Sequence, residues 1–269
     1  MLTDGLGRDF EWLHPEVLAD RCTVGKRGTL DLSGTKQYNS FRTLIIPASK
    51  TISVSTLNQA AALYEAGGKV IFTSQLPTRS AEAGADDWVV TLMGELLPQA
   101  AQGVYRNHNK NGGEVLFIEH PDLQTLSLAL QRTEPYDVEG IGYTPAMALA
   151  GGKANPGLKG GAVPLRYIHK ERNGKSIFYF ANLSDEPFDK EIALRGKKRF
   201  ELWNPHTGET YPVAAHYDKK GKENITLLRL TLPRLKSKNN CPANRRPVFP
   251  HQTIGLGSAL AMSATTGTV

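Results

Sequence analysis

Carboxyl groups are common in the first half of the chain, and two that face each other can cleave a glycosidic bond by acid–base chemistry. Such a pair must lie about 5–9.5 Å apart across the bond. The spacing along the sequence pairs no two of these groups across a cleft, so no catalytic carboxylate is predicted from them. The positions considered are Asp9, Glu11, Glu16, Asp20, Glu82, Asp86, Asp87, Glu119 and Asp122.

Histidine and cysteine could bind a metal or act in catalysis, but their spacing favours neither role. No two histidines lie four residues apart on one predicted helix, and none is next to a cysteine, so no metal site is predicted. Cys22 and Cys241 lie too far apart in the sequence to indicate a disulfide framework. Cys22 is at the end of a predicted short helix, and its thiol is predicted to be buried. His14 and His120 each precede a proline. They could face the cleft of a neighbouring domain or lie on the surface as turn residues.

The motifs for nucleotide binding and for a nucleophile are incomplete. A dinucleotide fingerprint needs three spaced glycines directly after a strand, and Gly5-Leu-Gly7 lacks both the strand and the third glycine. The turn after residues 70–73 reads Ser74-Gln75-Leu76-Pro77, without a cysteine or a G-x-S-x-G elbow. The sequence therefore predicts no cofactor and no catalytic residue on this turn.

Strands and helices alternate over residues 8–133. Thr43–Pro47, Lys69–Thr73 and Glu114–Glu119 are short apolar runs, typical of strands buried in a parallel sheet. The pattern predicts a small doubly wound α/β domain of the flavodoxin or amidotransferase type. The other predicted elements are helices at Pro15–Cys22, after a capping Ser55, at Asp86–Leu97 (with Trp88, Leu92 and Leu96 at helical spacing) and at Pro121–Arg132, and a strand at Leu30–Leu32.

Residues 163–236 have the pattern of a second, all-β domain. Asn173-Gly174 separates two runs rich in aromatic and β-branched residues, which is a strong hairpin signal. Short strands with turns every eight to twelve residues predict an antiparallel β-sandwich. The glycine-rich residues 134–162 are predicted to connect the two domains. The predicted strands are Val163–His169, Ser176–Ala181, Phe188–Leu194, Phe200–Trp203, Thr210–Val213 and Leu227–Leu232.

The net charge of +6 comes from the end of the chain. After Glu223 the sequence has no acidic residue but six lysines and arginines, so residues 1–228 carry no net charge. A neutral body with a basic tail does not indicate a nucleic-acid partner. No apolar run is long enough to predict a membrane-spanning helix.

Several ordered blocks carry a resemblance to a known family. They are DFEWLHPEVLADRCTV at 9–24, FRTLIIP at 41–47, LRYIHK at 165–170, IFYFANLSDEP at 177–187 and ELWNPHTGE at 201–209. Together they resemble the C-terminal region of large glycoside hydrolases, most closely the α-L-rhamnosidase-like family 106, over about residues 8 to 236. The resemblance implies a parent enzyme that hydrolyses terminal rhamnosyl linkages in polysaccharides, with carbohydrate as its partner.

In that family the catalytic acids belong to a (β/α)8 barrel that precedes the matching region, so no catalytic residue is carried over to this chain. Asp9, Glu11 and Trp12 are the candidate residues near the substrate site, because their block would join the end of the barrel. Trp12 could be a sugar-stacking platform or a packing residue. The family is usually exported, whereas the first eight residues show no signal peptide.

The resemblance ends near Ser237, where the composition changes abruptly. Residues 237–269 are predicted to be a disordered tail, either a translated frameshift or a natural basic extension. The chain as a whole is predicted to be a non-catalytic C-terminal fragment of a rhamnosidase-like glycoside hydrolase.

Two other functions are open. A free-standing carbohydrate-binding or structural module would need exposed aromatic residues on one sheet face, for which Tyr167, Phe178, Tyr179 and Trp203 are candidates. An independent α/β hydrolase or amidotransferase-like enzyme is disfavoured by the missing nucleophile elbow.

Overall fold

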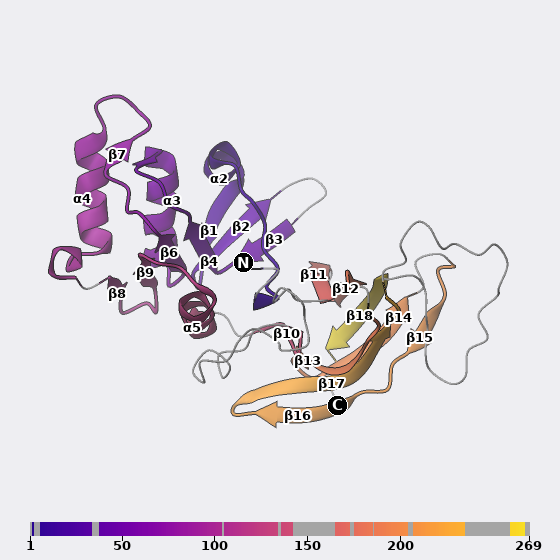
Figure 1. The fold of residues 1–269 in the computed structure, drawn as a ribbon. Helices are drawn as coiled ribbons and strands as arrows, with labels where there is room; N and C mark the ends of the chain where they lie inside the picture. Colours follow the sequence, from indigo (N-terminus) through magenta and orange to yellow (C-terminus); the bar gives the residue numbers. More distant parts are fainter. Residues whose placement is uncertain are drawn as a thin grey trace. The chain divides into compact units, whose positions relative to one another are not determined.

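A computed structural model shows two compact units (Figure 1). The α/β unit spans residues 11–135, and the β unit combines residues 1–10 with 136–269. The structure describes residue 2 and residues 6–33, 38–103, 105–133, 136–141, 165–172, 175–184, 186–203, 207–234 and 259–266.

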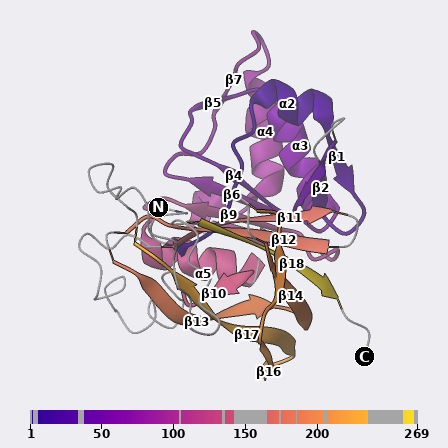
Figure 2. The ribbon, with the colours of Figure 1, turned by 90° about the vertical axis from the view of Figure 1, so that its right-hand side faces the viewer.

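The α/β unit contains a four-stranded sheet with the order β4-β6-β9-β8. β4, β6 and β9 are parallel, and β8 pairs antiparallel with β9 at the edge. Figures 1 and 2 show α3 and α4 on one side of this sheet and α5 on the other. The elements are β4 (Thr43–Ile46), α3 (Val54–Glu65), β6 (Lys69–Thr73), α4 (Asp86–Leu96), the 3-10 helix η1 (Ala100–Gln102), β8 (Arg106–His108), β9 (Glu114–Ile118) and α5 (Leu123–Thr133).

The three predicted strands are present in this sheet, but β4 is half-buried except at Ile46, and the flavodoxin-like topology is not confirmed. A doubly wound sheet reverses its strand order at a switch point. The three parallel strands described here follow one another in chain order without such a reversal. The unit also contains two smaller sheets, β1-β2-β3 and β5-β7. The helix α2 precedes both sheets in the sequence. Their bounds are α2 Pro15–Arg21, β1 Cys22–Gly25, β2 Thr29–Ser33, β3 Tyr38–Phe41, β5 Thr51–Ile52 and β7 Arg79–Ser80.

Local chemistry explains where the helices begin and which side they bury. The Oγ of Ser53 accepts a hydrogen bond from the amide of Thr56 at 3.2 Å, so Ser53 caps α3 and the predicted Ser55 does not. On α4 the buried face is formed by Val89, Leu92, Met93 and Leu96. Trp88 is half-exposed and precedes the first residue of this face by one position. The prediction that Trp88 lies on the buried face with Leu92 and Leu96 was therefore wrong. Cys22 is buried, as predicted.

The β unit packs two antiparallel sheets into the predicted β-sandwich (Figure 2). The four-stranded sheet has the order β10-β13-β17-β16, and the five-stranded sheet has the order β11-β12-β18-β14-β15. The bounds are β10 Val138–Glu139, β11 Leu165–Arg172, β12 Lys175–Asn182, β13 Phe188–Arg195, β14 Lys198–Trp203, β15 Thr210–Pro212, β16 His216–Lys220, β17 Glu223–Leu232 and β18 Ala259–Thr266.

Alternation along the strands builds the core of this sandwich. β12 buries every second residue, including Phe178 and Phe180, and β17 buries Leu228, Leu230 and Leu232. Successive side chains of a strand point to opposite faces, so each sheet sends one set inward.

β18 corrects the prediction that the whole segment 237–269 is a disordered tail. This strand pairs with β12 on one side and β14 on the other, and Met262 is 1% exposed in the core. Its small residues gave no strand signal, because β structure depends on pairing and packing more than on local preference. The frameshift hypothesis covers the whole tail to residue 269, of which the structure describes only residues 259–266.

The boundary between the units also differs from the predicted one at residue 8. The guanidinium of Arg8 lies 3.7 Å from the ring centre of Tyr136, and Asp9 accepts a hydrogen bond from the amide of His169 at 3.2 Å. β10 lies inside the predicted connection 134–162 but pairs with β13. These contacts attach Arg8, Asp9 and β10 to the β unit.

We expect Met262→Ala to lower the free energy of unfolding of the β unit by about 2–5 kcal/mol, because it leaves a cavity between the sheets. Deleting 259–269 should accelerate hydrogen exchange of the β12 and β14 amides, which would lose their partners. Denaturant unfolding and exchange mass spectrometry measure the two effects.

Tyr217→Ala is the control, since Tyr217 is 46% exposed and lies on β16, an edge strand of the other sheet. Its effect should stay within about 0.5 kcal/mol. Unchanged stability after both the Met262 substitution and the deletion would show that β18 does not hold the sheet together.

Candidate functional site

The structure places the three predicted site residues in different units. Asp9 belongs to the β unit, where its Oδ2 accepts from the backbone of His169. Glu11 and Trp12 belong to the α/β unit, where Glu11 Oε1 accepts from Asn39 Nδ2 at 2.7 Å. Trp12 is 82% exposed and is therefore not a core residue. Their part in substrate binding stays a prediction.

A partly buried polar cluster of the β unit lies next to Asp9, which contacts one of its members, His169. Asp137 uses both carboxylate oxygens: Oδ2 lies 3.1 Å from His169 Nδ1, and Oδ1 accepts from Arg195 Nη2 at 2.6 Å. The backbone carbonyl of Asp137 also accepts from the Arg195 amide at 3.0 Å. The His169 ring stacks on Phe178, with 4.1 Å between ring centres. We call Asp137, His169 and Arg195 the bridging cluster.

Electrostatics keep Asp137 ionised. Burial by itself raises the pKa of this carboxyl group, but the hydrogen bond from His169 and the positive charge of Arg195 outweigh it, so the pKa lies below its ordinary value. Burial, and next the charge of Asp137, raise the pKa of the Tyr167 hydroxyl well above its usual range. Both side chains thus keep one protonation state near neutral pH.

These properties fit a structural role better than a catalytic one. A general acid that protonates a glycosidic oxygen needs a raised pKa, which Asp137 does not have. In a Ser-His-Asp arrangement, the second ring nitrogen takes the proton of the nucleophile. Here His169 Nε2 is buried and has no hydrogen-bond partner among the described residues.

The cluster instead ties the two sheets together. Asp137 directly precedes β10 and Arg195 ends β13, both in the four-stranded sheet, whereas His169 lies on β11 of the other sheet. Sequence reasoning missed this group, since 32 residues separate Asp137 from His169 and no local pattern links them.

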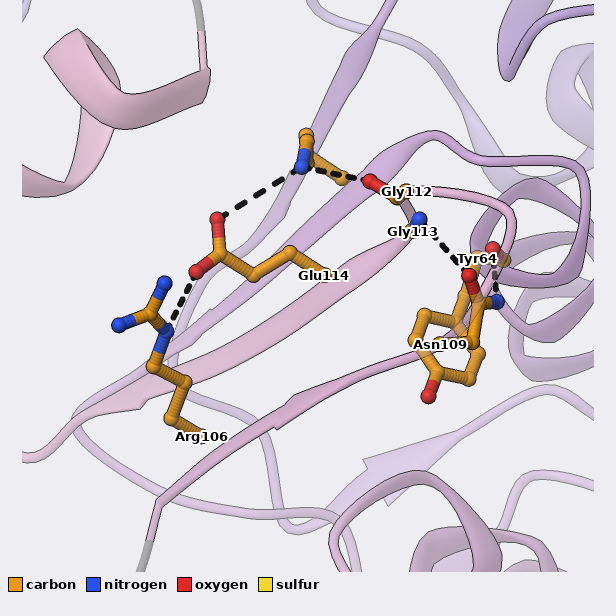
Figure 3. A network of polar contacts seen from close by, with 7 residues as sticks. Tyr64, Arg106, Asn109, Gly112, Gly113 and Glu114 are labelled. Atoms are coloured by element: carbon orange, nitrogen blue, oxygen red, sulfur yellow. Dashed lines mark hydrogen bonds and ion pairs between the residues drawn. The ribbon is translucent and has the colours of Figure 1, made fainter.

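A second polar network lies at the edge of the parallel sheet in the α/β unit (Figure 3). Glu114, buried at the start of β9, accepts from Arg106 Nε at 2.6 Å and lies 3.8 Å from Lys69 Nζ. Lys69 Nζ also donates to the carbonyl of Gly112 at 2.7 Å. Ligands of open α/β sheets bind at the carboxyl ends of the strands. This network lies at the opposite ends and holds the loop before β9.

The turn after β6 has a feature that the sequence did not indicate. Ser74 has a φ of 61°, a left-handed conformation that is rare for serine, and its amide donates to the Ile118 carbonyl at 2.8 Å. A nucleophile elbow leads from a strand directly into a helix. Here the chain continues to the strand β7, so the turn does not have that geometry.

Exposed aromatic residues gather on the outer face of the five-stranded sheet. Tyr179 on β12 and Trp203 on β14 are each 41% exposed. Tyr167 and Phe178, which were candidates for the same role, lie in the core. Alternation therefore divides the four predicted aromatics equally between the two faces of the sheet.

Among the described residues, no group of three or more His, Cys, Asp or Glu side chains could hold a metal ion. The described helices are also too short or too polar to cross a membrane.

We expect Asp137→Asn to lower the free energy of unfolding of the β unit by about 1–3 kcal/mol at pH 7, because the charged hydrogen bonds of His169 and Arg195 lose their acceptor. The folded-state pKa of Asp137 is depressed, so its stabilisation is present above the ordinary value of 3.8 and is lost as the pH falls through the folded value. The difference between the variant and the wild type should shrink below about pH 4 in urea titrations.

Asp189→Asn is the control for this experiment. Asp189 also binds an arginine, Arg229, at 2.8 Å, but on the exposed side of the four-stranded sheet. Its loss should lower stability by about 1 kcal/mol or less. Equal losses from the two substitutions at pH 7 would contradict the bridging role of Asp137.

Comparison with known proteins adds to this geometry. No curated protein sequence matched the chain. Among solved structures, the rhamnosidase from Novosphingobium sp. PP1Y is similar at 17% identity and a TM-score of 0.57, covering 94% of this chain and 19% of that one. The chain thus corresponds to less than a fifth of that enzyme's length, and the likeness shows a shared fold.

Two further structures are more distant. The β-galactosidase from Bacillus circulans sp. alkalophilus has 11% identity and a TM-score of 0.39. The matched region covers 84% of this chain and 33% of the β-galactosidase chain. The α-L-fucosidase isoenzyme 2 from Paenibacillus thiaminolyticus has 11% identity and a TM-score of 0.40. The matched region covers 85% of this chain and 41% of the fucosidase chain.

The family model of glycoside hydrolase family 106, described as alpha-L-rhamnosidase, matches residues 5–219. This match spans most of the chain and contains the sequence blocks that carried the resemblance, from the one that begins at Asp9 to the one that ends at Glu209. The chain belongs to the α-L-rhamnosidase family of glycoside hydrolases.

Proposed function

We propose that this chain is a non-catalytic, C-terminal region of a rhamnosidase-family glycoside hydrolase, whose parent enzyme removes terminal rhamnosyl groups from polysaccharides. One observation carries the proposal: the solved rhamnosidase covers 94% of this chain, whereas the chain covers 19% of that enzyme. The region would act as a scaffold beside the part that performs hydrolysis.

The described sheets support the proposal that another part of the parent enzyme performs hydrolysis. A (β/α)8 barrel closes eight parallel strands and takes about 250 residues. The largest sheet of the α/β unit has three parallel strands and an antiparallel edge, and the β unit contains only antiparallel pairs among its described strands.

The carboxylates of the β unit support it as well. Asp9 and Asp137 both contact His169, and they are the pair that most resembles a catalytic arrangement. Asp137 is held as an anion by two donors, so it cannot readily supply the proton that glycosidic cleavage requires.

We expect the purified chain to release no 4-nitrophenol from 4-nitrophenyl α-L-rhamnoside above the buffer rate between pH 4 and pH 8. The physical reason is that Asp137 has a lowered pKa, whereas the acid that protonates a glycosidic oxygen needs a raised one. Absorbance of the released phenolate measures the rate.

The complete rhamnosidase from Novosphingobium sp. PP1Y serves as the positive control in the same assay. The proposed non-catalytic role would be refuted if the chain hydrolysed the rhamnoside, if Asp9→Asn or Asp137→Asn abolished this activity, and if Asp189→Asn left it intact. Such a result would place the active site in the β unit.

A further inference from the structure

The outer face of the five-stranded sheet carries three exposed apolar residues in one row across the strands. In the strand register, Ile168 pairs with Tyr179, Tyr179 pairs with Ala261, and Ala261 pairs with Trp203. Paired residues of antiparallel strands share a face. Ile168, Tyr179 and Trp203 are 46%, 41% and 41% exposed, so this aromatic row lies on the surface of the unit.

The spacing of this row suits an extended ligand that crosses the strands. Tyr179 and Trp203 lie two strands apart, which corresponds to about 10 Å between their backbones. The paired position on β18, the strand between them, is an alanine, Ala261. Both rings are 41% exposed, so each can contact a ligand that lies across the strands.

Positive charges flank the aromatic row on the same face. Lys175 and Arg199 are both exposed and are linked through Thr265 in a second, parallel row, four residues along each strand from Tyr179 and Trp203. Lys170 is exposed two residues from Ile168. Glu201, between Arg199 and Trp203, is the single acidic residue among the described outward positions of this sheet.

We propose that this face binds an anionic carbohydrate chain, with sugar rings stacked on Tyr179 and Trp203 and sugar carboxylates paired with Lys175, Arg199 and Lys170. This face is separate from the bridging cluster, whose His169 lies on the inner side of the same sheet. The proposal adds a binding site to the scaffold role.

Three observations select this ligand. Aromatic rings beside hydrogen-bonding groups suit a ligand with one apolar and one polar side, as sugar rings have. Cations outnumber carboxylates on the face, which favours an acidic over a neutral sugar chain. Single-stranded nucleic acid also stacks on aromatic residues in basic grooves, but the family of this chain acts on carbohydrate.

The first test measures binding of the purified chain to polygalacturonate oligosaccharides by isothermal titration calorimetry. Tyr179→Ala and Trp203→Ala should each raise the dissociation constant about fivefold or more, since aromatic anchors dominate binding energy. Trp203→Phe should retain most of the affinity. Tyr217→Ala, which removes a ring of 46% exposure from β16 of the other sheet, should change nothing.

The second test isolates the contribution of charge. The double variant Lys175→Gln and Arg199→Gln should raise the dissociation constant about threefold. The pair Lys219→Gln and Lys222→Gln changes the net charge equally but lies outside this face, so it should leave binding unchanged. Fully methyl-esterified polygalacturonate, which keeps the sugar rings without the charges, should bind more weakly, and added salt should reduce the difference.

Four outcomes would overturn the inference: no binding of polygalacturonate, equal binding of its methyl ester, equal effects of Tyr217→Ala and Trp203→Ala, or tighter binding of oligothymidylate. Melting temperatures that match the wild type show that the surface variants remain folded. None of these outcomes alters the rhamnoside assay, so this inference and the scaffold proposal can fail separately.

Discussion

The backbone pairing of β18 with β12 and β14 is the interaction on which the five-stranded sheet depends. Without it, the sheet would fall into two separate hairpins, β11-β12 and β14-β15, each too small to be stable alone. Met262 on β18 completes the core, and the pairs of Ala261 bring Tyr179 and Trp203 into one row. The same strand therefore supports both the inner and the outer face.

The bridging cluster supplies a different kind of constraint. Most of the contact between the two sheets is apolar and therefore non-directional. The hydrogen bonds of Asp137 to His169 and Arg195 have fixed geometry, and they connect strands of both sheets. Because a buried charge without partners is strongly destabilising, these bonds favour one relative position of the sheets.

Sequence patterns predicted those elements whose signal is local. The apolar run of β6, the hairpin signal between β11 and β12, and the alternation of β17 all matched the structure. β18 and the two-residue β10 were missed because pairing partners far along the chain define them. For the candidate site, alternation could separate Tyr179 from Phe178, but no local pattern could join Asp137 to His169.

The late position of β18 has a consequence for how the chain folds during synthesis. Tyr179 pairs with Ala261, so the centre of the five-stranded sheet closes only after 81 intervening residues have been made. Until then β12 and β14 each have an unpaired strand edge. Contacts of such long sequence separation form slowly, and unpaired strand edges invite association with other chains. The β unit therefore has these unpaired edges during synthesis until β18 has been made.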